Sequence, residues 1–182
     1  HTEAPYWCAV NTKDEHSPSP SSLILSALWN PSLEPTRVIP LPPILEKIGI
    51  TNCLALTTGN FQFTRSDSFV SGKGEDGRNV SILEFDDKAG FAARFNSYRF
   101  SVNDNASTFV KTAYTALCQG VDEATPVECT LTQESAMVIN NIRALHCRDV
   151  IRDNRRVLVR IFGLSKFSTP IVVSEDPLVL QG

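Results

Sequence analysis

The chain has 182 residues, of which 42% are hydrophobic and 20% are charged, and its formal net charge is −3. The acidic balance argues against nucleic acid as a partner, because nucleic-acid-binding domains usually carry a strongly basic surface. No apolar run approaches the ~18 residues that a membrane-crossing helix needs. We therefore predict one globular domain over residues 1–182, with a substantial core and no membrane span.

The first third of the chain predicts an arm and two short helices. Residues 1–22 are polar and proline-bearing, which is typical of an irregular N-terminal arm. Ser21–Trp29 carries apolar residues at helical spacing and predicts a helix, although its length suits a buried strand almost as well. The run from Pro42 predicts a second helix that ends at Gly49, since proline near the start and glycine past the end is the usual polarity.

The central stretch 51–118 predicts the unit around which the fold is organised, an antiparallel β-meander closed by a helix. Its first strand is expected near Cys53, with a two-residue turn at Gly59-Asn60. Two aromatic-rich strand runs follow, Arg78–Phe85 and Phe91–Val102. The apolar set changes phase near Asn96-Ser97, within the second run, and a β-bulge there would keep both apolar sets facing the core.

The helix that closes this unit is expected over Thr108–Cys118, with Ser107 as its cap. We expect Phe109 and Tyr114 on its apolar stripe to be buried against the aromatic strand face. The alternating apolar residues after Arg156 predict a closing hairpin over 156–173. The predicted fold class is therefore α+β, an antiparallel β-meander with two or three short helices packed on it and stapled by disulfides.

Five cysteines are spread along the chain, and none forms a Cys-x-x-Cys pair, which excludes zinc-ribbon and thioredoxin-like sites. Cys118 and Cys129 bracket a short loop, so we predict a disulfide between them. Cys8 is expected to bond to Cys53 or Cys147 and to anchor the N-terminal arm.

Two glycosylation sequons begin at Asn79 and Asn105. The chain also lacks an initiating methionine, as a mature form does after signal removal. Together with the spaced cysteines, these features predict a secreted, extracellular glycoprotein.

The three histidines allow one metal hypothesis and one catalytic hypothesis. If His1 is a mature N-terminus, its amine and imidazole could chelate copper together with His16 or His146, which is similar to the histidine brace of secreted lytic polysaccharide monooxygenases. Otherwise no metal site is expected. Six arginines also gather in the C-terminal third, and because aspartates interleave with them we expect a solvated, salt-bridged face.

The motif Tyr6-Trp7-Cys8 resembles the aromatic-x-cysteine motif of secreted effector candidates from biotrophic plant-pathogenic fungi. Many of those proteins are similar in fold to guanyl-specific fungal ribonucleases, although this chain is longer and has more cysteines. The resemblance implies a host-facing role. It also allows a catalytic set in which Glu84 is the base, His146 the acid and Arg94 or Arg99 the supporting cation.

The sequence thus favours an effector-like protein that binds a host or extracellular protein without catalysis and without a cofactor. A secreted ribonuclease-like hydrolase is the first alternative. A copper protein built on the N-terminal histidine is the second.

Overall fold

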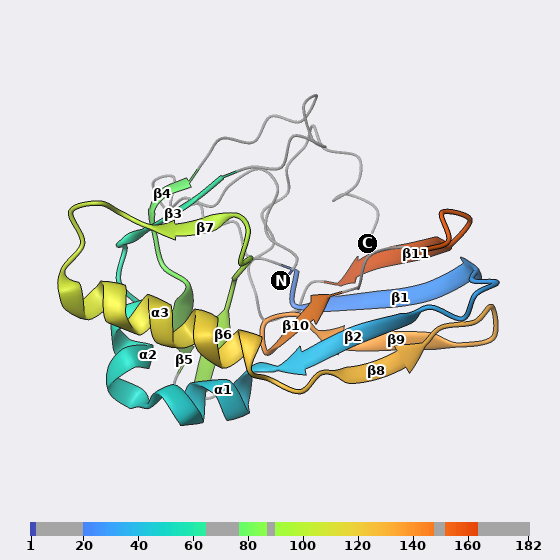
Figure 1. Ribbon diagram of the computed structural model, residues 1–182, viewed down its shortest axis with the longest axis horizontal. Coiled ribbons are helices and arrows are strands. Elements are labelled where there is room, and N and C mark those ends of the chain that lie inside the picture. The colour runs from blue at the N-terminus through green and yellow to red at the C-terminus, as the bar shows by residue number, and fades with distance from the viewer. Residues whose placement is uncertain (3–19, 65–76, 87–89, 148–151, 164–182) are drawn as a thin grey trace.

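The computed structural model describes residues 1–2, 20–64, 77–86, 90–147 and 152–163. The fold is α+β, with antiparallel strands and, within these ranges, three helices (Figure 1). The helices are α1 (Leu41–Ile48), α2 (Ile50–Leu56) and α3 (Thr108–Asp122). The strands are β1 (Ser22–Trp29), β2 (Pro35–Pro40), β3 (Phe61–Phe63), β4 (Gly77–Val80), β5 (Leu83–Asp86), β6 (Gly90–Ala93), β7 (Phe100–Val102), β8 (Val127–Thr130), β9 (Ala136–Asn140), β10 (Ala144–Cys147) and β11 (Val157–Gly163).

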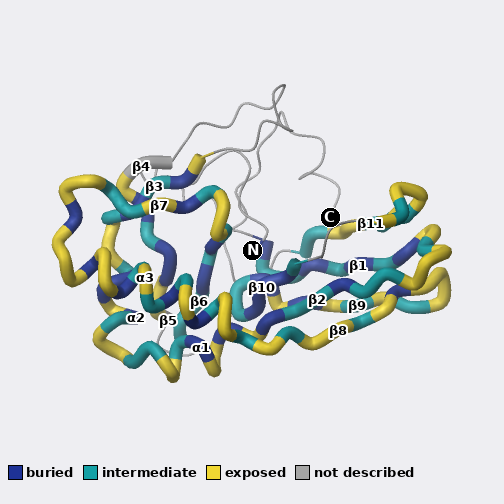
Figure 2. The backbone as a smooth tube through the Cα atoms, in the orientation of Figure 1, coloured by how far each residue is buried: buried dark blue, intermediate teal, exposed yellow. Residues whose placement is uncertain are grey.

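One half of the molecule is a sandwich of two three-stranded antiparallel sheets. The strand order is β11-β1-β9 in one sheet and β10-β2-β8 in the other. Their inner faces share a core to which strands of both sheets contribute. Its buried members are Leu23, Leu25, Ala27, Leu131, Ile139 and Ala144. Burial alternates along the strands, as a two-layer sandwich requires, and buried stretches run along β1 and β2 (Figure 2).

Strand β1 replaces the helix that was predicted for Ser21–Trp29. Leu23, Leu25 and Ala27 are buried on one face, whereas the intervening positions are not. This two-residue period is that of a strand, and β1 lies in the centre of its sheet between β11 and β9. The helical spacing in the sequence was wrong because it also counted Ile24 and Leu28, which point away from the core.

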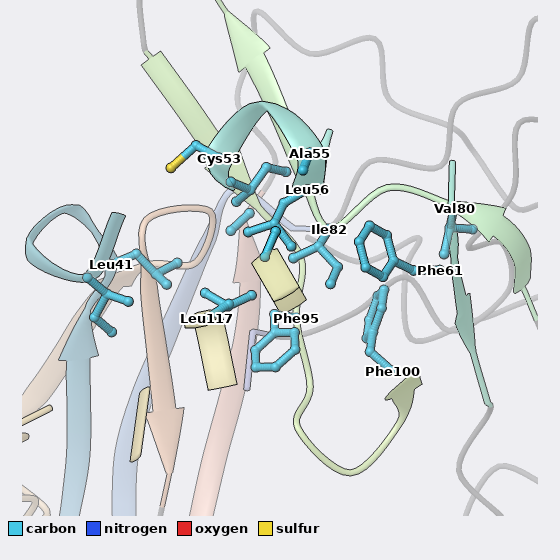
Figure 3. Close-up of a cluster of buried hydrophobic side chains, with 14 of the residues drawn as sticks. Leu41, Cys53, Ala55, Leu56, Phe61, Val80, Ile82, Phe95, Phe100 and Leu117 are labelled. Carbon is cyan, nitrogen blue, oxygen red and sulfur yellow. The ribbon is translucent and has the colours of Figure 1, made fainter. Parts of the chain in front are cut away.

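The other half of the molecule packs the three helices against β3–β7 around a second hydrophobic core (Figure 3). The aromatic rings of Phe61, Phe95 and Phe100 and the side chain of Leu117 lie at its centre. The helix predicted after Pro42 is confirmed as α1, which has proline in its first turn and Gly49 at its C-terminus.

The predicted meander over 51–118 is only partly correct. Its strands divide into a three-stranded sheet, β4-β3-β7, and a two-stranded sheet, β5-β6. Its first predicted strand is instead helix α2, which buries Cys53 and Leu56. Gly59 does not form a hairpin turn but links α2 to β3. A side chain there would meet the carbonyl oxygen of Asn79 at 2.7 Å, so close backbone approach requires glycine.

Helix α3 is confirmed, with the hydroxyl oxygen of Ser107 accepting a hydrogen bond from the Val110 amide at 3.3 Å. It continues past the predicted end at Cys118 to Asp122. Tyr114 packs on Phe95, at 6.3 Å between ring centroids, and its hydroxyl donates to the carbonyl of Phe100 at 2.7 Å. Phe109 was predicted to be buried there, but its side chain is 51% exposed.

The predicted disulfide staples are wrong for the cysteines that the structure describes, because Cys53, Cys118, Cys129 and Cys147 are all free thiols. Cys118 packs against the helical core, whereas Cys129 packs against the sandwich core. The two thiols therefore belong to different halves of the molecule. Cys8 lies outside the described residues.

Strand β11 is the last described strand and lies at the edge of the sheet β11-β1-β9. Strand β11 confirms the first strand of the closing hairpin, but its described partner is β1, and residues 164–173 lie outside the described ranges. Residues 3–19 of the predicted arm also lie outside them. No described helix is long and apolar enough to cross a membrane.

Two residues of α3 test this packing. We expect Leu117→Ala to lower the free energy of unfolding by ~2–5 kcal/mol, because Leu117 is 1% exposed and its loss leaves a cavity. Phe109→Ala on the same helix should cost less than about 1 kcal/mol. Denaturant unfolding of both variants measures the difference, and equal losses would contradict the observed orientation of α3.

Candidate active site

His1 and His146 form a backbone pair next to strand β10. The His1 amine donates to the carbonyl of His146 at 2.9 Å, and the His146 amide donates to the carbonyl of His1 at 2.8 Å. This reciprocal pattern is that of a hydrogen-bonded antiparallel pair, which places both side chains on one face. The two imidazole rings accordingly lie 4.3 Å apart between centroids.

The inner face of the sandwich holds this histidine pair. His146 is the register partner of Val38 on β2, and Val38 packs against the sandwich core. His146 itself is 8% exposed. Its chain neighbours Leu145 and Cys147 instead contact the helical core on the other face of the sheet. The alternation of β10 therefore directs one imidazole into the sandwich.

The second residue, Thr2, connects the pair to the helical half. Thr2 is 1% exposed. Its amide donates to the carbonyl of Phe95 at 2.8 Å, and its hydroxyl oxygen accepts from the Phe95 amide at 3.0 Å. The dipeptide His1-Thr2 is thus held between β10 and the segment after β6.

A buried hydroxyl and a guanidinium meet further along the same inner face. Thr36 on β2 is 5% exposed, and its hydroxyl accepts a hydrogen bond from Nη2 of Arg156 at 2.8 Å. Thr36 is two residues along β2 from Val38, the partner of His146, which is a spacing of roughly 7 Å. The Arg156 side chain therefore enters the sandwich near the histidine pair, whereas the sequence placed it on a solvated face.

The loop before β11 fixes the position of Arg156. The carboxylate of Glu34 accepts from the amides of Arg152 and Asp153, both at 2.9 Å. The carboxylate of Asp153 accepts from the Ser32 hydroxyl at 2.7 Å and from the Arg155 guanidinium at 2.8 Å. These bonds tie residues 152–155 to the β1–β2 turn, so the guanidinium of Arg156 reaches Thr36 from a fixed backbone.

Cys129 is the cross-strand neighbour of Thr36, and Arg160 lies on the inward-facing side of another strand, β11. Cys129 on β8 is the register partner of Thr36 and packs against the sandwich core, so its thiol shares the inner face. Arg160 on β11 pairs with the inward-facing Leu25, and its guanidinium lies 5.8 Å from the ring centroid of Phe162. A second cation thus lies on the same side of β11 as the sandwich core.

This arrangement can bind two kinds of ligand. Two adjacent imidazoles are ligands for a transition-metal ion. An arginine held beside a hydroxyl suits a carboxylate, because the guanidinium offers several donors in a planar fork. Within the described ranges, no group of three metal-binding side chains forms.

Only two members of the predicted ribonuclease set, Glu84 and Arg94, come together. Glu84 on β5 is paired with Arg94 at 2.8 Å, and its side chain is 61% exposed. His146 instead pairs with His1, and Arg99 lies in the turn before β7, with its amide donating to Asn96. The acid and the base of the hypothesis thus belong to different networks.

The copper hypothesis is also corrected. The brace requires the amine of His1 as a ligand, but that nitrogen donates to the carbonyl of His146. His16, one of its two proposed partners, lies outside the described residues. Asn79 and Asn105 are both exposed, and their glycosylation, like secretion and a protein partner, stays a prediction.

Comparison with solved structures finds the same fold in a non-heme iron oxygenase, OrfP. A mutant of OrfP in complex with (3S)-hydroxy-L-Arg has 24% sequence identity and a TM-score of 0.69, over 90% of this chain and 49% of that chain. OrfP in complex with Fe and alpha-ketoglutaric acid has 25% identity and a TM-score of 0.65, over 80% and 45% of the two chains. This chain spans about half the length of these structures. No family model and no curated protein matches it.

This likeness contradicts the predicted function. The chain was expected to be a non-catalytic, effector-like binding protein, but the solved structures that share its fold are those of an enzyme. The effector and virulence interpretation, the ribonuclease and the copper protein are all set aside. The motif Tyr6-Trp7-Cys8 covers three residues, and so short a motif does not specify a fold or a function.

One local spacing in the sequence is typical of a metal site and was not used in the prediction. His1 is followed two residues later by a carboxylate, Glu3. Residues i and i+2 of an extended strand share a face, so a His-x-Glu spacing can present an imidazole and a carboxylate together. Glu3 lies outside the described residues. No comparable local signal marks Arg156 or Thr36, which are 120 residues apart.

The loop that positions Arg156 should depend on pH. The pKa of Asp153 is held below its usual range, first by the Arg155 side chain, then by the Ser32 hydroxyl and the Arg155 amide. A carboxyl whose folded pKa is depressed stabilises the fold above its unfolded pKa, near 4, and loses this effect as pH falls through the folded pKa. Asp153→Asn should therefore lower unfolding stability most near neutral pH.

Denaturant unfolding of the wild-type protein and Asp153→Asn at pH 7 and pH 3 measures this dependence. The difference between the two proteins should shrink at the lower pH. A difference that grows on acidification would show that the carboxylate does not hold the loop.

Proposed function

We propose that this chain forms the catalytic half of a non-heme iron oxygenase that uses 2-oxoglutarate as co-substrate. The observation that carries the proposal is the histidine pair, with two imidazoles 4.3 Å apart on the inner face of a β-sandwich. The shared fold with OrfP supports it, because OrfP is an iron oxygenase solved with Fe and alpha-ketoglutaric acid. In this proposal the protein uses iron, whereas the sequence led us to expect no cofactor.

The two imidazoles supply part of the donor set of an iron site. Non-heme Fe(II) oxygenases use two histidines and one carboxylate and leave the other coordination positions open. We assign the two imidazoles to His1 and His146 and the carboxylate to Glu3, on the basis of its sequence spacing. Assigning both imidazoles to iron is consistent with the backbone pairing of His1 and His146, because this pairing brings the two rings to one face.

Arg156 and Thr36 are assigned to the co-substrate. The guanidinium and the hydroxyl together offer donors to the distal carboxylate of 2-oxoglutarate. Thr36 is two residues along β2 from Val38, the register partner of His146, so a dicarboxylate bound at Thr36 can extend towards the histidines. The apolar side chains of the sandwich core share this inner face.

The residues of the chain thus divide the work of binding and orientation. Bound iron would supply the activation of dioxygen. His1, His146 and Glu3 would hold it, while Arg156 and Thr36 orient the co-substrate. The low-polarity walls of the sandwich strengthen the charge pairing between Arg156 and a carboxylate. The whole proposed site therefore lies on the inner side of the sandwich and is assembled by β2, β10, the loop before β11 and residues 1–3.

Metal binding tests the histidine assignment. His1→Ala and His146→Ala should each weaken Co(II) or Fe(II) binding at least about 100-fold in anaerobic calorimetry, because each removes one of three proposed ligands. Glu84→Gln is the matched control, since Glu84 pairs with Arg94 away from the sandwich. Dioxygen uptake that requires both Fe(II) and 2-oxoglutarate should disappear in the two histidine variants. Unchanged metal affinity in both would remove the basis of the proposal.

Co-substrate binding tests the arginine assignment. Arg156→Ala should weaken 2-oxoglutarate binding at least about 10-fold, because the carboxylate loses a charge-assisted pair, which is worth ~1.5–3 kcal/mol. Metal affinity should stay unchanged. Arg152→Ala, which removes an exposed arginine from the same loop, should bind 2-oxoglutarate normally. Equal loss in both variants would indicate a general electrostatic effect instead of a specific pair.

Thiol labelling gives a second measure of the same pocket. Cys129 is the cross-strand neighbour of Thr36 on the inner face, whereas Cys147 faces the helical core. Bound 2-oxoglutarate should slow the labelling of Cys129 by N-ethylmaleimide and leave that of Cys147 unchanged. Protection should be lost in Arg156→Ala. Peptide mass spectrometry distinguishes the two thiols.

A further inference from the structure

Thr2 makes a two-point contact with Phe95 that the proposed iron site does not itself explain. Its amide and its hydroxyl both bond to the backbone of Phe95, at 2.8 and 3.0 Å. Its side chain is 1% exposed, so neither bond is open to competition from water. His1 bonds to β10 on one side of the chain, and Thr2 bonds to Phe95 on the other.

Phe95 is a fixed point of the helical half. It is 1% exposed, and its ring lies 6.0 Å from Phe100 and 6.3 Å from Tyr114 between centroids. The preceding residues are also held, because the Ala93 amide donates to the carbonyl of Ile142 and the Arg94 amide to that of Ile82. A bond to the Phe95 backbone is therefore a bond to the second hydrophobic core.

We propose that Thr2 is a positioning residue for the metal ligands, and that its hydroxyl sets the orientation of His1. This inference rests on the proposed iron site. His1 is bonded to β10 through its backbone, and the bond that the Thr2 hydroxyl accepts from the Phe95 amide adds a second contact to Phe95, which limits rotation of the His1-Thr2 strand about β10. The hydroxyl is engaged by the Phe95 amide and is not itself a metal ligand. Thr2 thus connects the ligand strand to the helical core as β10 connects it to the sandwich.

Outer-shell partners that orient a ligand typically change metal affinity 10–100-fold when removed. Thr2→Val keeps the shape of the side chain but removes the acceptor for the Phe95 amide. We expect it to weaken Co(II) binding about 10-fold or more and to alter the visible spectrum of the bound Co(II). Thr2→Ser keeps the acceptor and should restore both the affinity and the spectrum.

A general loss of stability needs its own control. Val110 on α3 is 5% exposed in the same helical core and takes no part in the Thr2–Phe95 hydrogen bonds, so Val110→Ala loosens that core while keeping the Thr2 contact. Its Co(II) affinity should match the wild type. If Val110→Ala weakens Co(II) binding as much as Thr2→Val does, or if Thr2→Ser fails to restore it, the positioning role is overturned.

Hydrogen exchange on the wild-type chain tests the same link without a variant. Coupling between two equilibria is reciprocal, so if the Thr2–Phe95 bond favours metal binding, bound metal must favour the bond. Co(II) should therefore slow exchange of the Phe95 amide, and an amide that exchanges at the same rate with and without Co(II) would overturn the inference. The two proposals fail differently: a wild-type chain that does not bind Co(II) refutes the iron site, whereas tight binding that is unaffected in Thr2→Val refutes only the role of Thr2.

Discussion

The two hydrogen bonds between His1 and His146 join residues that are 145 positions apart in the chain. Everything at the candidate site depends on this pairing, because an imidazole from each residue must reach the same face. An antiparallel hydrogen-bonded pair places both imidazoles on one face, and the contact of Thr2 with Phe95 holds the same strand from its other side. A register shift of one residue would send His146 to the outer face of the sheet and put Cys147 in its place. The site is therefore specified by backbone register before any metal or substrate binds.

The register is in turn held by the two hydrophobic cores, which lie on opposite faces of the sheet β10-β2-β8. On β10, Ala144 belongs to the sandwich core and Leu145 to the helical core. On β2, Val38 and Ile39 are divided in the same way. A slip of either strand would bury each side chain in the wrong core, so the cost of misregister is spread over several residues. The site lies where the two cores share a sheet, and this explains how one strand can serve both packing and chemistry.

Elements with strong local signals could be predicted from the sequence, and elements set by distant contacts could not. The cap at Ser107 and the stripe of α3 are local, as is the proline–glycine polarity of α1, and both helices form as expected. The apolar residues of β1 fit both the spacing of a helix and the alternation of a strand. Only the position of β1 between β11 and β9 in the sheet determines that it is a strand. The site was predicted only in part for the same reason. The copper hypothesis grouped His1 with His16 or His146, and no local pattern decides between these two; only the pairing of distant backbone segments does.

The position of Arg156 differs from the one that the local charge pattern predicts. Six arginines among aspartates indicated a solvated face, and Arg155 fits this description, since it pairs with Asp153 and its side chain is 68% exposed. Its neighbour Arg156 begins the approach to β11 and reaches the buried hydroxyl of Thr36 instead. Arg155 lies in the turn and Arg156 follows it, immediately before β11, so two neighbouring arginines serve the surface and the interior. A guanidinium held beside a buried hydroxyl presents donors that suit a carboxylate, and this links the position of Arg156 to the function proposed for the sandwich.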